Sequence, residues 1–196
     1  GAMAQLRGGP TAALAADVGP VIDERARHGI EAHLAAMAAL GRRVRRLPLN
    51  TPGQAPLPKG HWLAPALVEI DAMGELTHEV FGPVLHVLRW QRGELPALLQ
   101  AIGATGYALT LGVHSRIEET IAAVIEGSRA GNVYVNRNMV GAVVGVQPFG
   151  GEGLSGTGPK AGGPLQLLRL LSRAPAEAVR RALGEGDAVR RSVALD

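Results

Sequence analysis

The spacing of apolar residues predicts three helices. Between Asp23, a candidate N-cap residue, and Gly41, placed where a C-cap glycine belongs, apolar side chains recur every three or four residues. The same period marks two shorter stretches, residues 94–102 and 118–128. Each stretch gathers its apolar residues on one side, so we expect amphipathic helices that pack against a core.

A basic run directly after the first helix, and runs of apolar residues further along the chain, predict strands. We expect strands over residues 42–47, 84–90, 107–113 and 132–136, with a loop rich in proline and glycine at residues 48–60. Alternating strands and helices are typical of an α/β layered architecture with parallel crossovers. We therefore predict that the last three strands lie in one sheet with the helices between them.

A glycine-rich segment over residues 137–164 has no helical period. Its valines, Phe149 and Leu154 are apolar, whereas a flexible solvated linker would be polar. We therefore favour an ordered loop that faces a ligand or an interface over a flexible surface loop. Residues 151–156 match the G-x-G-x-x-G dinucleotide fingerprint. They lack the strand before and the helix after that this motif needs, so we reject the match.

Composition narrows the function classes. With 46% hydrophobic and 19% charged residues, the 196-residue chain has the make-up of one globular unit. The net charge of +3 is small, and no apolar run approaches the roughly 20 residues that span a bilayer. We expect neither nucleic-acid binding nor a membrane span by this segment. The six histidines are scattered, and we predict no metal site. The absence of cysteine excludes disulfides and a cysteine nucleophile within the chain.

Five motifs follow one another at residues 17–23 (Asp-Val-Gly-Pro-Val-Ile-Asp), 79–84 (Glu-Val-Phe-Gly-Pro-Val), 135–138, 141–151 and 155–164. In this order and spacing they make the chain similar to the aldehyde dehydrogenase superfamily. The resemblance is closest to the L-glutamate γ-semialdehyde (1-pyrroline-5-carboxylate) dehydrogenase domain of bifunctional bacterial proline-utilisation proteins, the PutA group. It implies an α/β fold, namely the C-terminal portion of a three-layer catalytic domain with its anchor loop and oligomerisation segment.

The resemblance also implies roles for individual residues. Glu79 matches the glutamate that accepts hydrogen bonds from the nicotinamide ribose of NAD, and Phe81 matches the phenylalanine beside the nicotinamide. The readings without a ligand are an exposed glutamate and a core phenylalanine. In the anchor loop, Gly141 and Ala142 match the backbone amides that bind the substrate carboxylate. Phe149 matches the aromatic residue that packs on the aliphatic part of the substrate, or it is a core residue that anchors the loop.

In the family a cysteine thiolate attacks the aldehyde, hydride passes to NAD, and water hydrolyses the thioester. This chain has no cysteine. We expect no catalytic residue in it, with the nucleophile and base supplied by an upstream remainder of the same polypeptide. The chain alone should be inactive. FAD would belong only to a fused proline dehydrogenase domain. We expect a bacterial, cytoplasmic enzyme, a homo-oligomer, whose small-molecule substrate is L-glutamate γ-semialdehyde.

The resemblance divides the chain at residue 173. Residues 1–173 form the C-terminal part of the catalytic domain, with the anchor loop at 137–164. Residues 174–196 form a linker or the start of a truncated extension, with a short helix near residues 175–184. The alternative function is a non-catalytic aldehyde-dehydrogenase-like module, kept for dimerisation or for covering a substrate tunnel.

Overall fold

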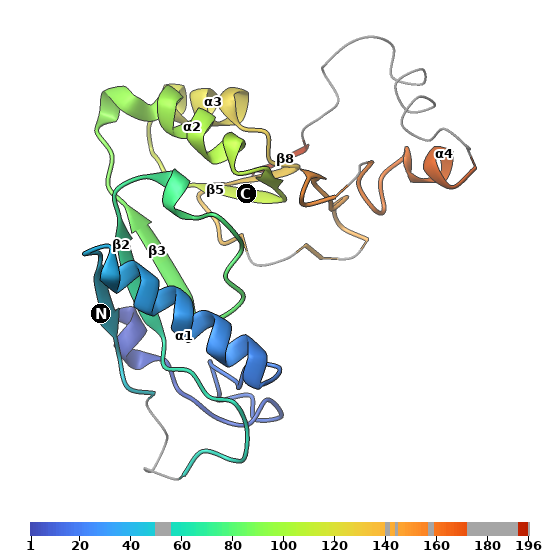
Figure 1. The fold of residues 1–196 in the computed structure, drawn as a ribbon. Helices are drawn as coiled ribbons and strands as arrows, with labels where there is room; N and C mark the ends of the chain where they lie inside the picture. Colours follow the sequence, from blue (N-terminus) through green and yellow to red (C-terminus); the bar gives the residue numbers. More distant parts are fainter. Residues whose placement is uncertain (50–55, 140–141, 144, 157–158, 172–191, 196) are drawn as a thin grey trace. The chain divides into compact units, whose positions relative to one another are not determined.

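A computed structural model of the protein describes residues 1–49, 56–139, 142–143, 145–156, 159–171 and 192–195. The chain, drawn as a ribbon in Figure 1, divides into two units, Gly1–Arg89 and Trp90–Asp196. Each unit has its own hydrophobic core. Helices and strands alternate in both units, which confirms the predicted α/β class.

In the first unit the long helix is α1, Glu24–Ala39. Its N-cap is Asp23, whose carboxylate accepts a hydrogen bond from a backbone N–H of the first turn at 2.7 Å. At the other end the N–H groups of Gly41 and Arg42 donate to two carbonyls of the last turn, which forms a Schellman motif. Gly41 has φ +77, a conformation that glycine adopts without strain. Both predicted ends of the helix are confirmed.

A three-stranded sheet packs against this helix (Figure 1). Strand β1, Arg43–Arg46, confirms the predicted basic strand and runs antiparallel to β2, Ala66–Ile70. In turn, β2 pairs in parallel with β3, Val84–Leu88. The central strand β2 is missing from the sequence prediction. Short 3-10 helices lie at Ala2–Gln5 (η1) and Met73–Glu75 (η3).

The core of the first unit lies between α1 and β2. The helix buries Ile30, Leu34 and Met37, which are spaced four and three residues apart and therefore share one face. The strand buries every second residue, as expected for a strand with one face on the core. The buried set is completed by Leu63, Ala66, Val68 and Ile70.

The second unit packs two helices against a parallel sheet. Its central strand β6 pairs in parallel with β5 and β8, while β4 and β7 form a separate antiparallel pair. The predicted helices are confirmed as α2 and α3, each within two residues of its expected ends. The elements are η4 (Arg92–Glu94), α2 (Leu95–Ala104), β4 (Tyr107–Ala108), β5 (Thr110–Val113), α3 (Glu118–Gly127), β6 (Asn132–Val135), β7 (Glu152–Gly153), α4 (Gln166–Leu171) and β8 (Ser192–Leu195).

The prediction that residues 84–90, 107–113 and 132–136 share one sheet is wrong. Strand β3 pairs with β2, whereas β5 and β6 pair with each other in the second unit. The segment 107–113 is itself divided at Leu109, because its first two residues pair with β7 and its last four with β6. The error has one physical source. Strands pair with segments distant in sequence, and no local pattern within residues 84–90 or 107–113 shows that β2 and β7 are their partners.

None of the helices in the described part of the chain is long and apolar enough to cross a membrane. The helix expected near residues 175–184 lies outside the described residues. The division of the chain at residue 173 therefore stays a prediction.

Candidate functional site

The first predicted site lies in the short irregular segment that leads into β3. Val80 packs against the core of the first unit, while its neighbours Glu79 and Phe81 are exposed. Phe81 is 75% exposed, so within this chain it is not a core residue. Among the described residues, the Glu79 side chain makes no hydrogen bond or ion pair.

Gly82 and Pro83 fix this segment to the fold. A Cβ atom on Gly82 would lie 2.3 Å from Cδ1 of Ile30, so any larger residue here would have to displace the buried Ile30 side chain of α1. The carbonyl of Pro83 accepts a hydrogen bond from the N–H of Ala66 at 2.9 Å. The N–H of Val84 donates to the carbonyl of Gly82 at 2.8 Å. The backbone that carries Glu79 and Phe81 is therefore fixed by contacts with both α1 and β2.

The second predicted site is the loop after β6. Ala142 is partly buried, and Gly141 lies outside the described residues. The loop turns back where the N–H of Val146 donates to the carbonyl of Val143 at 3.0 Å. Phe149 is half-buried, and its backbone N–H and carbonyl both pair with Ala161, at 3.0 and 2.9 Å. The loop is ordered around Phe149, as the sequence predicted.

Two glycines near this loop serve backbone packing. A Cβ atom on Gly131 would lie 1.9 Å from the carbonyl oxygen of Gly150. One on Gly151 would lie 2.4 Å from the carbonyl oxygen of Ala108. Such distances leave no room for a side chain, so these glycines let the loop lie directly on the strands. Residues 151–156 carry β7 and no helix, in agreement with the rejection of a dinucleotide fingerprint.

The comparison with known families matches residues 1–172 to the model "Aldehyde dehydrogenase family". The chain belongs to the aldehyde dehydrogenase family. It is 56% identical to the bifunctional protein PutA of Klebsiella aerogenes over 97% of this chain and 15% of that protein. It is 34% identical to a 1-pyrroline-5-carboxylate dehydrogenase of Geobacillus kaustophilus over 84% of this chain and 31% of that protein.

Solved structures agree. A crystal structure of a Bradyrhizobium japonicum proline utilization A (PutA) mutant matches with a TM-score of 0.73 and 52% identity, over 83% of this chain and 16% of that one. The chain therefore spans about one sixth of the length of these PutA relatives. The resemblance and the fold class drawn from the sequence motifs are both confirmed.

In this aldehyde dehydrogenase segment the predicted site residues fall into two groups. Glu79 and Phe81 belong to the first unit, and Ala142 and Phe149 belong to the second. Their assignments to cofactor and substrate stay predictions.

Three histidines of the first unit meet in a cluster that sequence spacing did not reveal. His33 of α1 is buried, and its Nε2 lies 2.8 Å from Nε2 of His86 on β3. The ring of His78 lies edge-on to His33, with the ring centroids 5.7 Å apart. Burial, with the charge of His78 as a second cause, lowers the pKa of His33; burial and then His33 lower that of His86. Within the described ranges, no group of three or more ligands could hold a metal ion.

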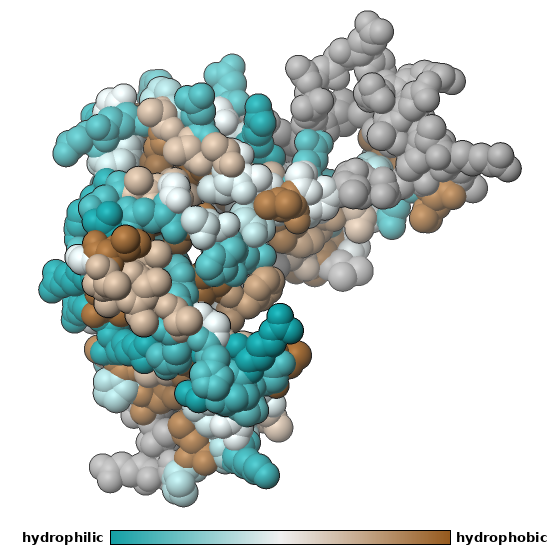
Figure 2. All heavy atoms as spheres, in the orientation of Figure 1, coloured by the Kyte–Doolittle hydropathy of each residue, from teal (hydrophilic) through white to brown (hydrophobic). Residues whose placement is uncertain are grey.

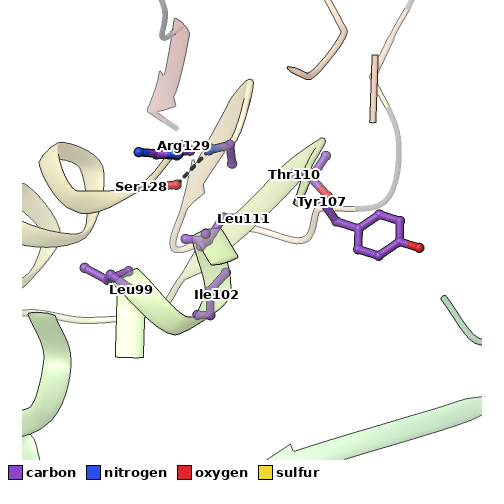
Figure 3. A pocket seen from close by; sticks show the side chains of 9 residues that line it. Leu99, Ile102, Tyr107, Thr110, Leu111, Ser128 and Arg129 are labelled. Carbon is purple, nitrogen blue, oxygen red and sulfur yellow. Dashed lines mark hydrogen bonds between the residues drawn. The ribbon is translucent and has the colours of Figure 1, made fainter. Parts of the chain in front are cut away.

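The second unit encloses a small cavity beside β5. Its volume of about 30 Å³ holds roughly one or two waters, which is too little for an organic substrate. The aliphatic side chains of Leu99, Ile102 and Leu111 line it, while the ring of Tyr107 points away from them (Figure 3). The Oγ atom of Ser128 accepts a hydrogen bond from the N–H of Ala130 at 3.0 Å. The cavity is a packing defect of the core and not a candidate site.

Proposed function

We propose that the chain is the C-terminal part of an NAD-dependent L-glutamate γ-semialdehyde dehydrogenase, which oxidises the semialdehyde to glutamate in proline catabolism. The family match and the names of the relatives, PutA and 1-pyrroline-5-carboxylate dehydrogenase, support this function. The ring of 1-pyrroline-5-carboxylate opens on hydration to give L-glutamate γ-semialdehyde. A 1-pyrroline-5-carboxylate dehydrogenase and a glutamate semialdehyde dehydrogenase therefore act on the same substrate. The remainder of the polypeptide supplies the nucleophile and the base, and we expect the whole enzyme to be a cytoplasmic bacterial homo-oligomer.

The observation that carries the cofactor role is the presentation of Glu79 and Phe81. The Glu79 carboxylate has no partner in the described part of the chain, so it is able to accept hydrogen bonds from both hydroxyls of a ribose. One ionised carboxylate can accept from two donors. A 75% exposed phenyl ring beside it offers an apolar face to a planar ring. This pair of side chains fits the nicotinamide end of NAD.

The chemistry follows from these positions. When bound, NAD would supply the hydride acceptor for oxidation of the aldehyde. Glu79 would bind the ribose from a backbone segment that does not have to reorganise. Phe81 would exclude water from the adjoining nicotinamide ring. In the loop, the amides at Gly141 and Ala142 would bind the substrate carboxylate, and Phe149 would pack on its methylene groups.

The test is Glu79→Gln in the full-length enzyme. The amide keeps the size of the side chain and loses the charge, and a hydrogen bond to a charged acceptor is worth roughly 1.5–3 kcal/mol. We expect the KM for NAD to rise by roughly ten- to a hundredfold, with the KM for the semialdehyde almost unchanged. Steady-state kinetics with each substrate varied in turn measures both constants.

The matched control is Glu119→Gln, which makes the same chemical change on an exposed residue of α3 and should leave both KM values unchanged. If Glu79→Gln keeps the wild-type KM for NAD, Glu79 is only a surface residue. A full-length protein without any dehydrogenase activity would be a different outcome, and it would favour the non-catalytic module.

A further inference from the structure

Strand β6 is buried on both faces. Val133 and Val135 belong to the hydrophobic core of the second unit. The alternate residues, Asn132 and Tyr134, are also buried, with 2% and 0% of their surface exposed. Alternate residues of a strand share a face, so Asn132 and Tyr134 point together to the side away from that core. Buried polar side chains need hydrogen-bond partners, and the glycine-rich loop supplies them.

Asn132 holds the loop on either side of Phe149. Its Nδ2 donates a hydrogen bond to the carbonyl of Pro148 at 3.0 Å, and its Oδ1 accepts one from the N–H of Gly150 at 3.4 Å. One amide side chain thus binds the backbone just before and just after Phe149. Together with the two backbone bonds to Ala161, this fixes the course of the chain at that residue.

Tyr134 binds Gln147, the residue directly before Pro148. Its phenol oxygen accepts a hydrogen bond from Nε2 of Gln147 at 2.6 Å. The guanidinium of Arg137 lies over the ring, 5.1 Å from its centroid, which restrains the ring from the start of the loop.

The departing arm of the loop is held as well. Asn136, directly after β6, has φ +56, a left-handed conformation that asparagine tolerates better than most residues. Its side chain bonds both backbone groups of Ser115: Oδ1 accepts from the N–H and Nδ2 donates to the carbonyl, each at 2.9 Å. Side chains of β6 therefore hold the returning arm of the loop, and the side chain directly after β6 holds the departing arm to the segment that follows β5.

We propose that Asn132 and Tyr134 are positioning residues, which hold the returning arm of the loop in its substrate-binding conformation through Pro148, Gly150 and Gln147. This inference rests on the proposed function, in which the loop binds the semialdehyde carboxylate. A loop ordered before the substrate arrives loses little conformational freedom on binding, so these hydrogen bonds raise affinity without touching the substrate. Removing these hydrogen bonds should weaken the binding of an aldehyde that carries the carboxylate. It should leave the binding of an aldehyde without a carboxylate unchanged.

The experiment uses the full-length enzyme and the substitutions Tyr134→Phe and Gln147→Met, alone and together. Tyr134→Phe keeps the buried ring and removes only the hydrogen-bond acceptor. We expect each single change to raise the KM for glutamate semialdehyde about two- to tenfold, the range of one neutral hydrogen bond. The kcat, the KM for NAD and the KM for propionaldehyde should change less than twofold. The double variant should be no worse than either single one, because both changes break the same bond.

The matched control is Tyr107→Phe, which removes a phenol oxygen from the same unit without cutting a hydrogen bond that the described residues make to it. It should behave as wild type with both aldehydes. Equal losses with both aldehydes in Tyr134→Phe, or no loss with either, would overturn the positioning role.

Ala142→Pro separates this proposal from the proposed function. That change removes a backbone amide from the carboxylate-binding part of the loop and should raise the KM for the semialdehyde alone. If Ala142→Pro discriminates between the aldehydes and Tyr134→Phe does not, positioning by β6 is wrong and the substrate role of the loop stands. If neither discriminates, the substrate role is wrong and the positioning role fails with it.

Discussion

At the scale of single residues, the segment before β3 shows how a motif combines structural and functional positions. Val80, Gly82 and Pro83 each have a role in the fold: a core contact, a close approach to α1 and a hydrogen bond to β2. Glu79 and Phe81 have no such role in the described unit. The structural roles therefore fall on residues 80, 82 and 83, and the side chains of residues 79 and 81 are left for a ligand.

Gly82→Ala tests the close approach. The added Cβ would lie 2.3 Å from Cδ1 of Ile30, which is buried and has little room to move. We expect the free energy of local unfolding to fall by about 1–3 kcal/mol, the usual cost of overpacking. Hydrogen exchange of the α1 amides in the full-length enzyme measures it.

Gly29→Ala is the matched control in the same unit. A Cβ atom there meets nothing within 4 Å, and the residue lies in the interior of α1. Alanine is the better helix former, so this change should stabilise α1 by about 0.5–1 kcal/mol. Equal effects of the two substitutions would contradict the steric role assigned to Gly82.

At the scale of elements, α1 and β3 meet through histidines as well as through the apolar core. His33 and His86 approach at 2.8 Å, with the edge of the His78 ring beside them. Two imidazolium ions at this distance would repel each other, so at least one ring stays neutral. The lowered pKa values of His33 and His86 follow from burial first and from the neighbouring imidazole second.

This contact predicts a pH-dependent stability of the first unit. As the pH falls below about 6.5, the unfolded chain binds protons at these histidines before the folded one does, so the free energy of unfolding decreases. The decrease ends once the pH passes the lowered pKa values of the folded state. Three carboxyls also have lowered pKa values, but their protonation reduces the free energy of unfolding only below about pH 4.5. They are those of Glu24, Glu31 and Glu75.

His86→Gln should flatten this dependence between pH 7 and pH 5, because only one member of the close pair remains. Hydrogen exchange of α1 amides at several pH values, corrected for intrinsic rates, follows it. The control His114→Gln removes an exposed histidine of the second unit and should keep the wild-type dependence. A slope that His86→Gln leaves unchanged would show that the histidine contact does not link protonation to folding.

At the scale of the whole molecule, both units expose apolar side chains (Figure 2). Surfaces of this kind are typical of regions that meet other protein or a ligand. The relatives of this chain are about six times its length in the PutA group. The exposed apolar residues include Leu14, Ile22 and Leu85 in the first unit and Val143, Val146, Leu154, Leu167 and Leu170 in the second.

The purified 196-residue chain should not reduce NAD with glutamate semialdehyde, even at high concentration. It has no cysteine, and neither serine nor histidine replaces a thiolate in thioester chemistry. The full-length enzyme should be active in the same assay of NADH absorbance. Turnover by the chain alone would contradict the proposed mechanism, provided that controls exclude a contaminating enzyme as its source.

The sequence by itself determined the features that depend on neighbours along the chain. The cap at Asp23 and the turn at Gly41 use hydrogen bonds within one helix, so local patterns predict them. The helices α2 and α3 follow from apolar spacing alone. The family also followed from motif order, because a motif is a local string of residues.

Only the tertiary structure decided which strands pair and which polar side chains meet. A strand forms hydrogen bonds with a partner distant in sequence, so nothing within residues 84–90 or 132–136 showed that they belong to different sheets. His33 and His86 are 53 positions apart and meet because a helix packs on a sheet. The polar face of β6 likewise gains its meaning from a loop that returns to cover it: Asn132 and Tyr134 are buried and hydrogen-bonded only because Gln147, Pro148 and Gly150 lie against them.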